Sequence, residues 1–391
     1  MNAPLQLGVI GLGRAFTLML PTFARHPLIK LTSASDPRAD ARARFARDFN
    51  ATVYENAEDL CADPSVQAVY VASPHQFHKT HVKLAASHGK HVLVEKPMAL
   101  TIEECRDMIA IARDHGVHLL VGHSHSYDAP YLRVRELVQS SLYGDVRMIT
   151  ALNYTDFLYR PRRPEELDTS AGGGVVFSQA AHQIDVVRLL AGKKAFSVRA
   201  LSGRWDPARP TEGAYNAQIL FEGGTFASLT YSGYGRFDTD EFNEWVGELG
   251  QKRDPNSYGT ARKLLRTAST IEDEIALKNR RAYGPAGTEA FQPSGQLDHN
   301  HFGLVVVSCE RADLRPTPRE IIIHGDDERT IESIRRPDIP RAEVADELYE
   351  AATLDKAPLH SGEWGLATLE ICLAILESAK TNREIELLHQ I

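Results

Sequence analysis

Residues 8–16 read "GVIGLGRAF" and decide the fold of the first third of the chain. They overlap the apolar run "LQLGVI" (5–10), which predicts a buried strand, and lead into a helical pattern that extends to about Arg25. Gly11 permits a tight turn after the strand, and Gly13 lets a pyrophosphate approach the backbone where the helix begins. The alternative interpretation is a tight turn that binds nothing.

Phe16 stands where this glycine pattern has its third glycine. That glycine serves the close packing of helix against strand rather than contact with a ligand. We therefore expect the helix to stand slightly farther from the strand, while Ala15 keeps the backbone close. Arg14, Ala15 and Phe16 are counted among the predicted nucleotide-binding positions.

Asp36 lies 23 residues beyond Gly13, directly after the second predicted strand, "IKLTSAS" (29–35). An acidic side chain at this place accepts hydrogen bonds from the adenosine ribose of a dinucleotide. Its charge would repel a 2′-phosphate, so NAD is favoured over NADP. Arg38 is close enough to blur that preference.

Apolar strands alternate with helices up to about residue 122. Further buried strands are predicted at "QAVYVAS" (67–73), "HVLVEK" (91–96) and "VHLLVG" (117–122), and a helix begins near Pro37. The helix "TIEECRDMIAIARDHG" (101–116) has a capping box of Thr101 and Glu104, with Gly116 as its C-cap signal. This alternation predicts a doubly wound parallel sheet over residues 1–122.

Residues 123–391 are predicted to form a second, α+β domain. Strands follow one another without helices at 147–157, 196–203, 215–221 and 225–233, and Glu222–Gly224 forms a hairpin turn. Helices are predicted at 175–192 and 362–382. We expect an open, mostly antiparallel sheet with helices on one side, and a polar insertion at about 236–300 with a helix at 261–280.

Bulk composition excludes several classes of protein. The 391 residues carry a net charge of −8, which argues against a nucleic-acid binder. No apolar run reaches the about 18 residues that a membrane helix needs, and the first residues have no basic segment of a secretion signal. The four cysteines are scattered without a C-x-x-C pair, so neither a disulfide framework nor a zinc site is predicted. We expect a cytoplasmic protein.

The sequence "VEKP" places Glu95, Lys96 and Pro97 at the C-terminal edge of a predicted strand. Ligands of open parallel sheets bind at this edge, so Lys96 is a candidate for contact with a substrate. The alternative is a solvated lysine at a strand end.

Four segments together resemble the Gfo/Idh/MocA family of NAD(P)-dependent oxidoreductases: "GVIGLG" (8–13), "YVASPHQFHKTH" (70–81), "VLVEKP" (92–97) and "GGGVVFSQAAHQID" (172–185). The resemblance implies NAD or NADP as coenzyme and a homo-oligomer, a dimer or tetramer, assembled through the second sheet. It implies that Lys96 and His182 are catalytic, with a Lys96–Pro97 bond that is cis. Coenzyme contacts are then expected at Ser73, Pro74, His78, Glu95, Lys96 and Pro97.

The family pattern has an aspartate four residues before the histidine, whereas this chain has Ser178. On an α-helix Ser178 and His182 would share a face and line one site. Asp185, one turn later, is expected either to orient the imidazole or to form a surface ion pair. The alternative for His182 is a hydrogen-bonded histidine of the core.

More narrowly, "GHSHSYDAPY" (122–131), "YRPRRPEELDTSAGGG" (159–174) and "SQAAHQID" (178–185) resemble the phthalate 4,5-cis-dihydrodiol (4,5-dihydroxyphthalate) dehydrogenase branch. A neutral Ser178 would not repel an anionic substrate, and arginine forks can clamp its carboxylates. Substrate contacts are therefore expected at Arg160, Arg162, Arg163, His123 and His125. The alternative for the arginines is a solvated loop.

Two histidine groups invite a metal interpretation: His75, His78 and His81, and then Asp298, His299 and His301. The first falls in a segment that the family resemblance assigns to the coenzyme region, and the second has no assignable partner. We expect no metal.

The sequence thus predicts a dehydrogenase that oxidises a cyclic secondary alcohol by hydride transfer, with Lys96 as proton acceptor or relay and His182 as its helper. A dihydrodiol substrate would become aromatic after oxidation, which makes the reaction strongly favourable. The alternatives are a sugar or inositol dehydrogenase of the same family and a catalytically inactive redox sensor that binds NAD(P).

Overall fold

The computed structural model describes residues 3–284 and 295–391, which divide into two compact units. The first unit contains residues 3–123, 276–284 and 339–369. The second unit contains residues 124–275, 295–338 and 370–391. Helices α9 (Ile271–Asn279) and α11 (Gly362–Thr381) each contribute residues to both units. Residues 285–294 of the predicted insertion lie outside the described residues.

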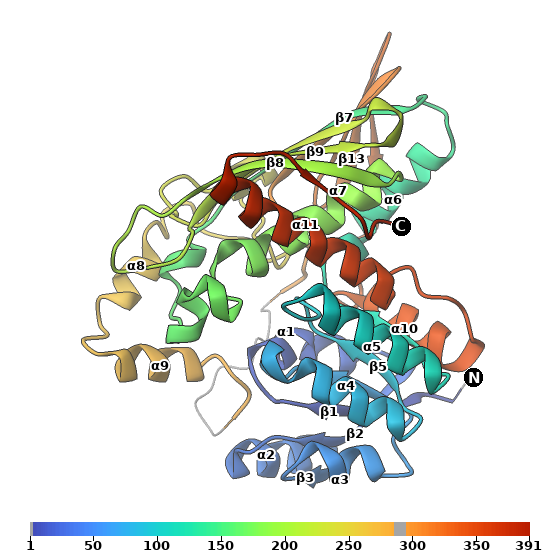
Figure 1. The fold of residues 1–391 in the computed structure, drawn as a ribbon, viewed down its shortest axis with the longest axis vertical. Helices are drawn as coiled ribbons and strands as arrows, with labels where there is room; N and C mark the ends of the chain where they lie inside the picture. Colours follow the sequence, from blue (N-terminus) through green and yellow to red (C-terminus); the bar gives the residue numbers. More distant parts are fainter. Residues whose placement is uncertain (1–2, 285–294) are drawn as a thin grey trace. The chain divides into compact units, whose positions relative to one another are not determined.

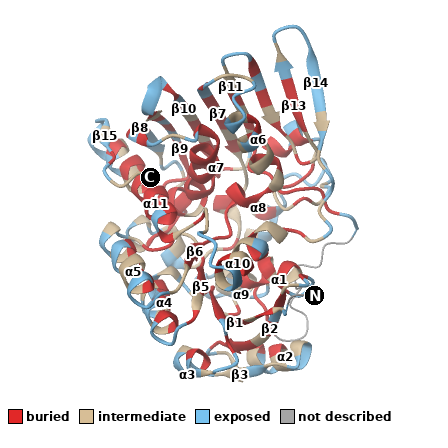
Figure 2. Cartoon of the chain, turned by 90° about the vertical axis from the view of Figure 1, so that its right-hand side faces the viewer, coloured by how far each residue is buried: buried red, intermediate tan, exposed pale blue. Residues whose placement is uncertain are grey.

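The first unit is built on a parallel sheet with the strand order β3-β2-β1-β4-β5-β6. This order is that of a dinucleotide-binding doubly wound fold, as the sequence predicts. The central strands are buried, as Figure 2 shows, because helices cover the sheet. The strands are β1 (Leu5–Ile10), β2 (Ile29–Ser35), β3 (Thr52–Tyr54), β4 (Ala68–Val71), β5 (His91–Val94) and β6 (Leu119–Val121).

The helices of the first unit are α1 (Arg14–Phe23), α2 (Ala39–Phe49), α3 (Ala57–Ala62), α4 (His78–Ser87), α5 (Ile102–Asp114) and α10 (Ala342–Leu354). The predicted cap of α5 is present: the Thr101 hydroxyl accepts a hydrogen bond from the amide of Glu104 at 3.1 Å. The Glu104 carboxylate in turn accepts from the amide of Leu100 at 3.3 Å, one residue earlier than in a standard capping box. Gly116 has a φ of 65°, which ends the helix as predicted.

The second unit contains a larger sheet with the order β14-β13-β12-β11-β7-β10-β9-β8-β15. Its pairings are antiparallel except for β10 with β7, so the predicted mostly antiparallel sheet is confirmed. Glu222–Gly224 joins β9 to β10 as the predicted hairpin. The strands are β7 (Val146–Tyr154), β8 (Ala195–Gly203), β9 (Ala214–Phe221), β10 (Phe226–Ser232), β11 (Leu304–Cys309), β12 (Ala312–Pro316), β13 (Glu320–Gly325), β14 (Arg329–Ser333) and β15 (Ile385–Glu386).

Helices α6 (Ala129–Gln139) and α7 (Ala181–Ala191) pack on one face of this sheet, against β12, β13 and β7 (Figure 1). Every residue of α7 is buried (Figure 2). The prediction of one α-helix over 175–192 is wrong at its start, because Val176–Ala180 forms a π-helical turn before α7. The helix predicted at 261–280 is two helices, α8 (Thr260–Leu265) and α9. No helix within the described ranges is long and apolar enough to cross a membrane.

Candidate active site

The glycine turn at the end of β1 has the geometry of a phosphate cradle. Gly11 has a φ of 94°, and a Cβ there would lie 2.8 Å from the carbonyl oxygen of Ala72, so only glycine fits. Gly13 is the N-cap of α1, and a Cβ there would meet nothing within 4 Å. The open space at Gly13 faces the positive end of a helix, where a pyrophosphate binds. The residues present therefore fit a dinucleotide.

Phe16 is fully buried and forms part of an aromatic cluster. Its ring centroid lies 5.7 Å from that of Phe45 on α2 and 5.3 Å from that of Tyr283. The Tyr283 hydroxyl donates to the carboxylate of Asp48 at 2.6 Å, and the Arg44 guanidinium lies 4.6 Å from the Tyr283 ring centroid. Phe16 stands at the position of the helix-packing glycine, and its ring packs against Tyr283 near the end of the insertion. The polar sequence around Tyr283 gives no sign of this contact.

Asp36 is tied to the glycine turn. Its carboxylate accepts from the amide of Leu12 at 2.8 Å, which links the end of β2 to the residue between the two glycines. The side chain of Arg38 donates to the same carboxylate at 2.9 Å and to the Leu12 carbonyl at 2.8 Å. These hydrogen bonds hold the turn in its shape through the protein's own groups, and Arg38 partly neutralises the acid that the ribose would meet.

The buried ring of His78 lies between the segments that follow β4 and β5. Its Nε2 lies 3.0 Å from the carbonyl oxygen of Ser73, and its Nδ1 lies 3.1 Å from that of Pro97. Burial lowers the pKa of His78 to about 4, so the ring is neutral near pH 7. His78 is 1% exposed, and as a neutral ring it donates to one of these carbonyls, while Pro74 begins the turn that leads into α4. The Lys96–Pro97 bond is cis, as the family resemblance implies.

Glu95, next to Lys96, is buried in the interior of the first unit. Its carboxylate accepts from the Tyr70 hydroxyl and lies 3.5 Å from Nδ1 of His123. Burial alone would raise the pKa of Glu95, but His123, Tyr70 and Lys96 outweigh it and lower that pKa. Glu95 therefore stays ionised and anchors the strand end from which partly exposed Lys96 projects.

The glycine run at 172–174 is required by sterics in the second unit. A Cβ on Gly173 would lie 2.6 Å from the backbone of Glu166, and one on Gly174 would clash with the carboxylate of Glu212. That carboxylate accepts from the amide of Val176 at 3.1 Å and so caps the π-helical turn. The run brings the chain to α7 in one defined direction.

Ser178 lies within the π-helical turn, and His182 lies in the first turn of α7. Because the π-helical turn changes the spacing, Ser178 and His182 are not related as positions i and i+4 of one α-helix, and the predicted shared face is wrong in this respect. Asp185 is 6% exposed, and the Ser126 hydroxyl donates to it at 3.5 Å. Asp185 is therefore a buried carboxylate rather than a surface one, and its charge stabilises that of Arg188 on the same helix.

His182 packs against a second buried histidine. Its ring centroid lies 4.9 Å from that of His125, with the two rings at 70°, and 5.3 Å from that of Phe302. His125 also lies 2.7 Å, through Nδ1, from the carboxylate of Asp128. The two predicted histidines His123 and His125 thus separate: His123 faces Glu95 in the first unit, and His125 faces His182 in the second.

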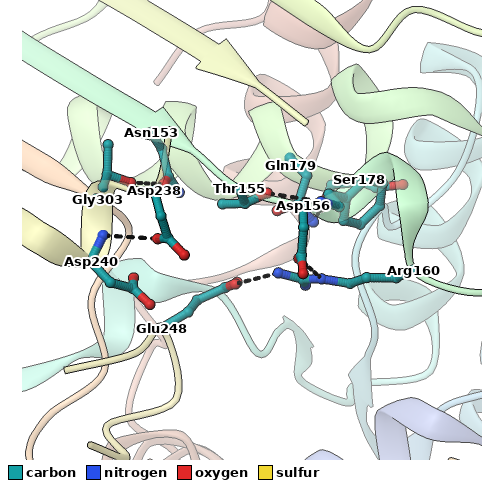
Figure 3. Close-up of polar contacts among 12 residues, drawn as sticks. Asn153, Thr155, Asp156, Arg160, Ser178, Gln179, Asp238, Asp240, Glu248 and Gly303 are labelled. Carbon is teal, nitrogen blue, oxygen red and sulfur yellow. Dashed lines mark hydrogen bonds and ion pairs between the residues drawn. The ribbon is translucent and has the colours of Figure 1, made fainter. Parts of the chain in front are cut away.

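Arg160 is held between two carboxylates (Figure 3). Its Nε donates to Asp156 at 2.8 Å, and its Nη2 lies 3.7 Å from Glu248. Glu248 also lies 3.7 Å from Nε2 of His125, so it connects the arginine to the histidine pair. This glutamate comes from the polar insertion, and Arg253 pairs with Asp238 and Asp240 in the same segment. Sequence reasoning did not identify Glu248, because only the fold brings it to His125.

The other two arginines of the predicted cluster differ from Arg160. The Arg162 guanidinium lies 3.6 Å from the centroid of the Phe157 ring and donates to the Phe157 carbonyl at 2.9 Å. Arg163 begins a short helical turn, where its amide donates to Glu166 at 2.8 Å. Arg162 therefore stabilises its own loop.

Histidines of both groups that were considered as metal ligands make hydrogen bonds within the protein. His81 lies 2.9 Å from the Ser73 hydroxyl, His299 bonds the carbonyl of Arg335, and His301 bonds that of Val246. Within the described part of the chain, no group of three or more His, Cys, Asp or Glu side chains could hold a metal ion.

The strand order and the glycine cradle define a dinucleotide-binding unit joined to a second, sheet-based unit. Residues 5–123 match the model of an oxidoreductase family with an NAD-binding Rossmann fold, and residues 131–251 match the GFO/IDH/MocA C-terminal domain. The chain belongs to the Gfo/Idh/MocA family of NAD-dependent oxidoreductases.

Three known proteins illustrate the likeness. The chain is 47% identical over 377 residues to 1-carboxy-3-chloro-3,4-dihydroxycyclohexa-1,5-diene dehydrogenase of Comamonas testosteroni, covering 96% of this chain and 95% of that one. It is 30% identical to inositol 2-dehydrogenase of Ralstonia nicotianae over 51% of this chain and 58% of that one. A solved structure from Bordetella bronchiseptica RB50 is 40% identical, with a TM-score of 0.92 over 98% of this chain and 100% of that one.

Proposed function

We propose that this NAD-dependent dehydrogenase oxidises a ring hydroxyl of a dihydroxycyclohexadiene carboxylate, a class that includes phthalate 4,5-dihydrodiol. The observation that carries the proposal is the 47% identity, over 96% of the chain, to the Comamonas testosteroni enzyme named for such a substrate. The dihydrodiol branch predicted from residues 122–131 and 159–185 points to the same class.

The reaction removes a hydride from the carbinol carbon and a proton from its hydroxyl, which leaves a ketone. NAD, when bound at Gly11, Gly13 and Asp36, supplies the hydride acceptor. Lys96 hydrogen-bonds the reacting hydroxyl through Nζ and accepts or relays its proton, and His182 holds the hydroxyl oxygen by a hydrogen bond. Where the neighbouring carbinol carbon carries a hydrogen, as in phthalate 4,5-dihydrodiol, the ketone then tautomerises: a proton leaves that carbon, another adds to the ketone oxygen, and a catechol results.

Arg160 is our candidate for binding the substrate's carboxylate. Its Nη2 is 3.7 Å from Glu248, beyond hydrogen-bond distance, whereas Arg162 is stacked and bonded within its own loop. A fork of guanidinium donors suits a carboxylate. We expect Arg160→Gln to raise the KM of a carboxylated cis-dihydrodiol at least tenfold and to leave that of cis-dihydrobenzenediol, which lacks the carboxylate, unchanged.

The direct test follows NADH absorbance with NAD and four substrates: a dihydroxycyclohexadiene carboxylate, phthalate 4,5-dihydrodiol, myo-inositol and glucose. Fast turnover of either diol carboxylate supports the proposal. Preference for inositol or glucose favours the alternative of a sugar or inositol dehydrogenase, which the 30% identity to inositol 2-dehydrogenase motivates. NADH binding without turnover of any substrate favours the redox sensor.

The catalytic residues are tested in the same assay. We expect Lys96→Ala to reduce kcat at least a hundredfold with nearly unchanged NADH affinity. Lys79→Ala is the matched control, because Lys79 is an exposed lysine of the same unit that pairs with Asp107. Wild-type turnover in Lys96→Ala would refute the role of Lys96.

We further propose a homo-oligomer assembled through the second sheet. Met148, Leu201 and Phe226 are 37%, 62% and 42% exposed, which is unusual for large apolar side chains on strands β7, β8 and β10. Light scattering of the full chain at micromolar concentration checks this, and a monomer of 43.4 kDa would contradict it.

A further inference from the structure

His125 lies between two carboxylates in the interior of the second unit. Its Nδ1 is 2.7 Å from Asp128, and its Nε2 is 3.7 Å from Glu248. A neutral imidazole has a lone pair on one nitrogen, and that lone pair would face a carboxylate here. Only the imidazolium form presents a proton to both acids, so the surroundings of His125 favour the charged ring.

The ring of His125 meets that of His182 edge to face, and Phe302 lies against both rings, with centroid distances of 5.0 and 5.3 Å. The turn that carries His125 is fastened to α7 a second time, through the bond from Ser126 to Asp185. His182 is therefore enclosed on two sides by rings whose own positions are fixed.

We propose that Asp128 and His125 form a positioning pair for His182, which fixes its ring and keeps its imidazole neutral. The inference rests on the proposed role of His182 in the dehydrogenase reaction. A cation beside an imidazole disfavours a second positive charge, and a neutral imidazole can hold the hydroxyl of the substrate while Lys96 removes its proton. Ser178, in the preceding turn, is uncharged and therefore does not influence the protonation of His182 through a charge.

The charged and titratable groups around His125 come from several elements. Asp128 follows in the same turn, Glu248 comes from the insertion, His182 lies on α7, and His301 precedes β11. Behind them, Arg160 lies 3.7 Å from Glu248, and Asn300 donates to Asp128 at 3.3 Å. Burial opposes a charge on His125, but Asp128 and Glu248 outweigh burial and raise the pKa of His125. Among these groups, His125 has a ring that contacts the ring of His182 directly.

The test is an NMR titration of the His182 ring in the full chain without substrate. We expect His125→Asn to raise the pKa of His182 by about one unit, because the neighbouring cation is lost while Asp128 and Glu248 remain. Asp128→Asn retains both imidazole side chains, and its effect should have the same sign, because losing the Asp128 carboxylate lowers the pKa of His125. This second variant decides the matter if His125→Asn does not fold.

His299→Asn is the matched control, because His299 is another buried histidine of this unit and bonds the Arg335 carbonyl. It should leave the His182 titration unchanged. In the turnover assay, the acid limb of kcat/KM should move to higher pH in both test variants, with unaltered NADH affinity.

An unchanged or lowered pKa of His182 in folded variants overturns the positioning pair. The titration needs no turnover, so it separates the two proposals. A shifted His182 in a chain inactive on every diol would sink the proposed function alone, and an active chain without the shift would sink the positioning pair alone.

Discussion

Alanine substitutions at Gly11 and Gly13 should separate the stability of the glycine turn from its binding of coenzyme. At Gly11 the new Cβ would lie 2.8 to 2.9 Å from the backbone of Ala72 and Ser73. The φ of 94° adds roughly 1–2 kcal/mol of strain for an L side chain. With the backbone displacement included, we expect Gly11→Ala to lose about 2–4 kcal/mol of unfolding free energy.

Gly13→Ala should behave differently, because its φ of −79° is ordinary and a Cβ there meets open space. The variant should be as stable as the wild type or up to about 1 kcal/mol more stable, since the unfolded chain loses freedom. NADH affinity should nevertheless fall at least tenfold, about 1.4 kcal/mol, because the methyl group stands where the pyrophosphate approaches.

Urea unfolding and NADH fluorescence titration measure the two quantities in the same preparations. Wild-type NADH affinity in Gly13→Ala would show that the open space at Gly13 is not the pyrophosphate site. Unfolding of Gly11→Ala at the wild-type urea concentration would show that a Cβ at this position is tolerated without strain.

Three more predictions follow from buried contacts. Phe16→Ala should lose about 3–5 kcal/mol in urea unfolding, because its ring is fully buried against Tyr283. Asp36→Asn should weaken NADH binding about tenfold by fluorescence titration, since charged hydrogen bonds contribute about 1.5–3 kcal/mol. Burial lowers the pKa values of His78 and His301 to about 4, so the unfolded chain takes up protons between pH 6.5 and 4. Stability should therefore fall as the pH falls through this window, by up to about 3 kcal/mol per histidine in urea melts.

Each of these predictions has a control. Phe77→Ala removes a ring that is 49% exposed and should change the stability little. Asp40→Asn alters an exposed acid of the neighbouring helix and should leave NADH affinity unchanged. The acid prediction fails if His78→Asn loses stability below pH 6.5 as steeply as the wild type does.

The sequence predicts the first unit well because its signals are local. Apolar runs mark β1 and β2 to the residue, and Thr101 with Gly116 marks the ends of α5. Strands β11 to β14 have no counterpart among the predictions, although Leu304–Cys309 and Glu320–Gly325 contain the β-branched residues typical of strands.

The site residues also divide into those that a local sequence pattern brings together and those that only the fold brings together. Gly11, Gly13 and Asp36 belong to one strand–helix–strand unit, so their proximity follows from the pattern. The link between His125 and Glu248 spans 123 positions and depends on the path of the insertion. Short-range pattern cannot supply such a contact. The π-helical turn is equally hidden, because "VVFSQAAHQID" reads as a continuous α-helix.

The first unit is assembled from segments that lie far apart in the sequence, and this affects how the chain folds during synthesis. The Thr22 hydroxyl donates to the carbonyl of Pro340 at 2.6 Å, and Arg341 donates to that of Leu18 at 2.7 Å. At ribosomal rates, residue 341 is made roughly 10 to 45 s after residue 123, so α1 waits that long for these partners. The NAD-binding unit therefore lacks these contacts while most of the second unit is translated. A fragment of residues 1–123 would lack them altogether.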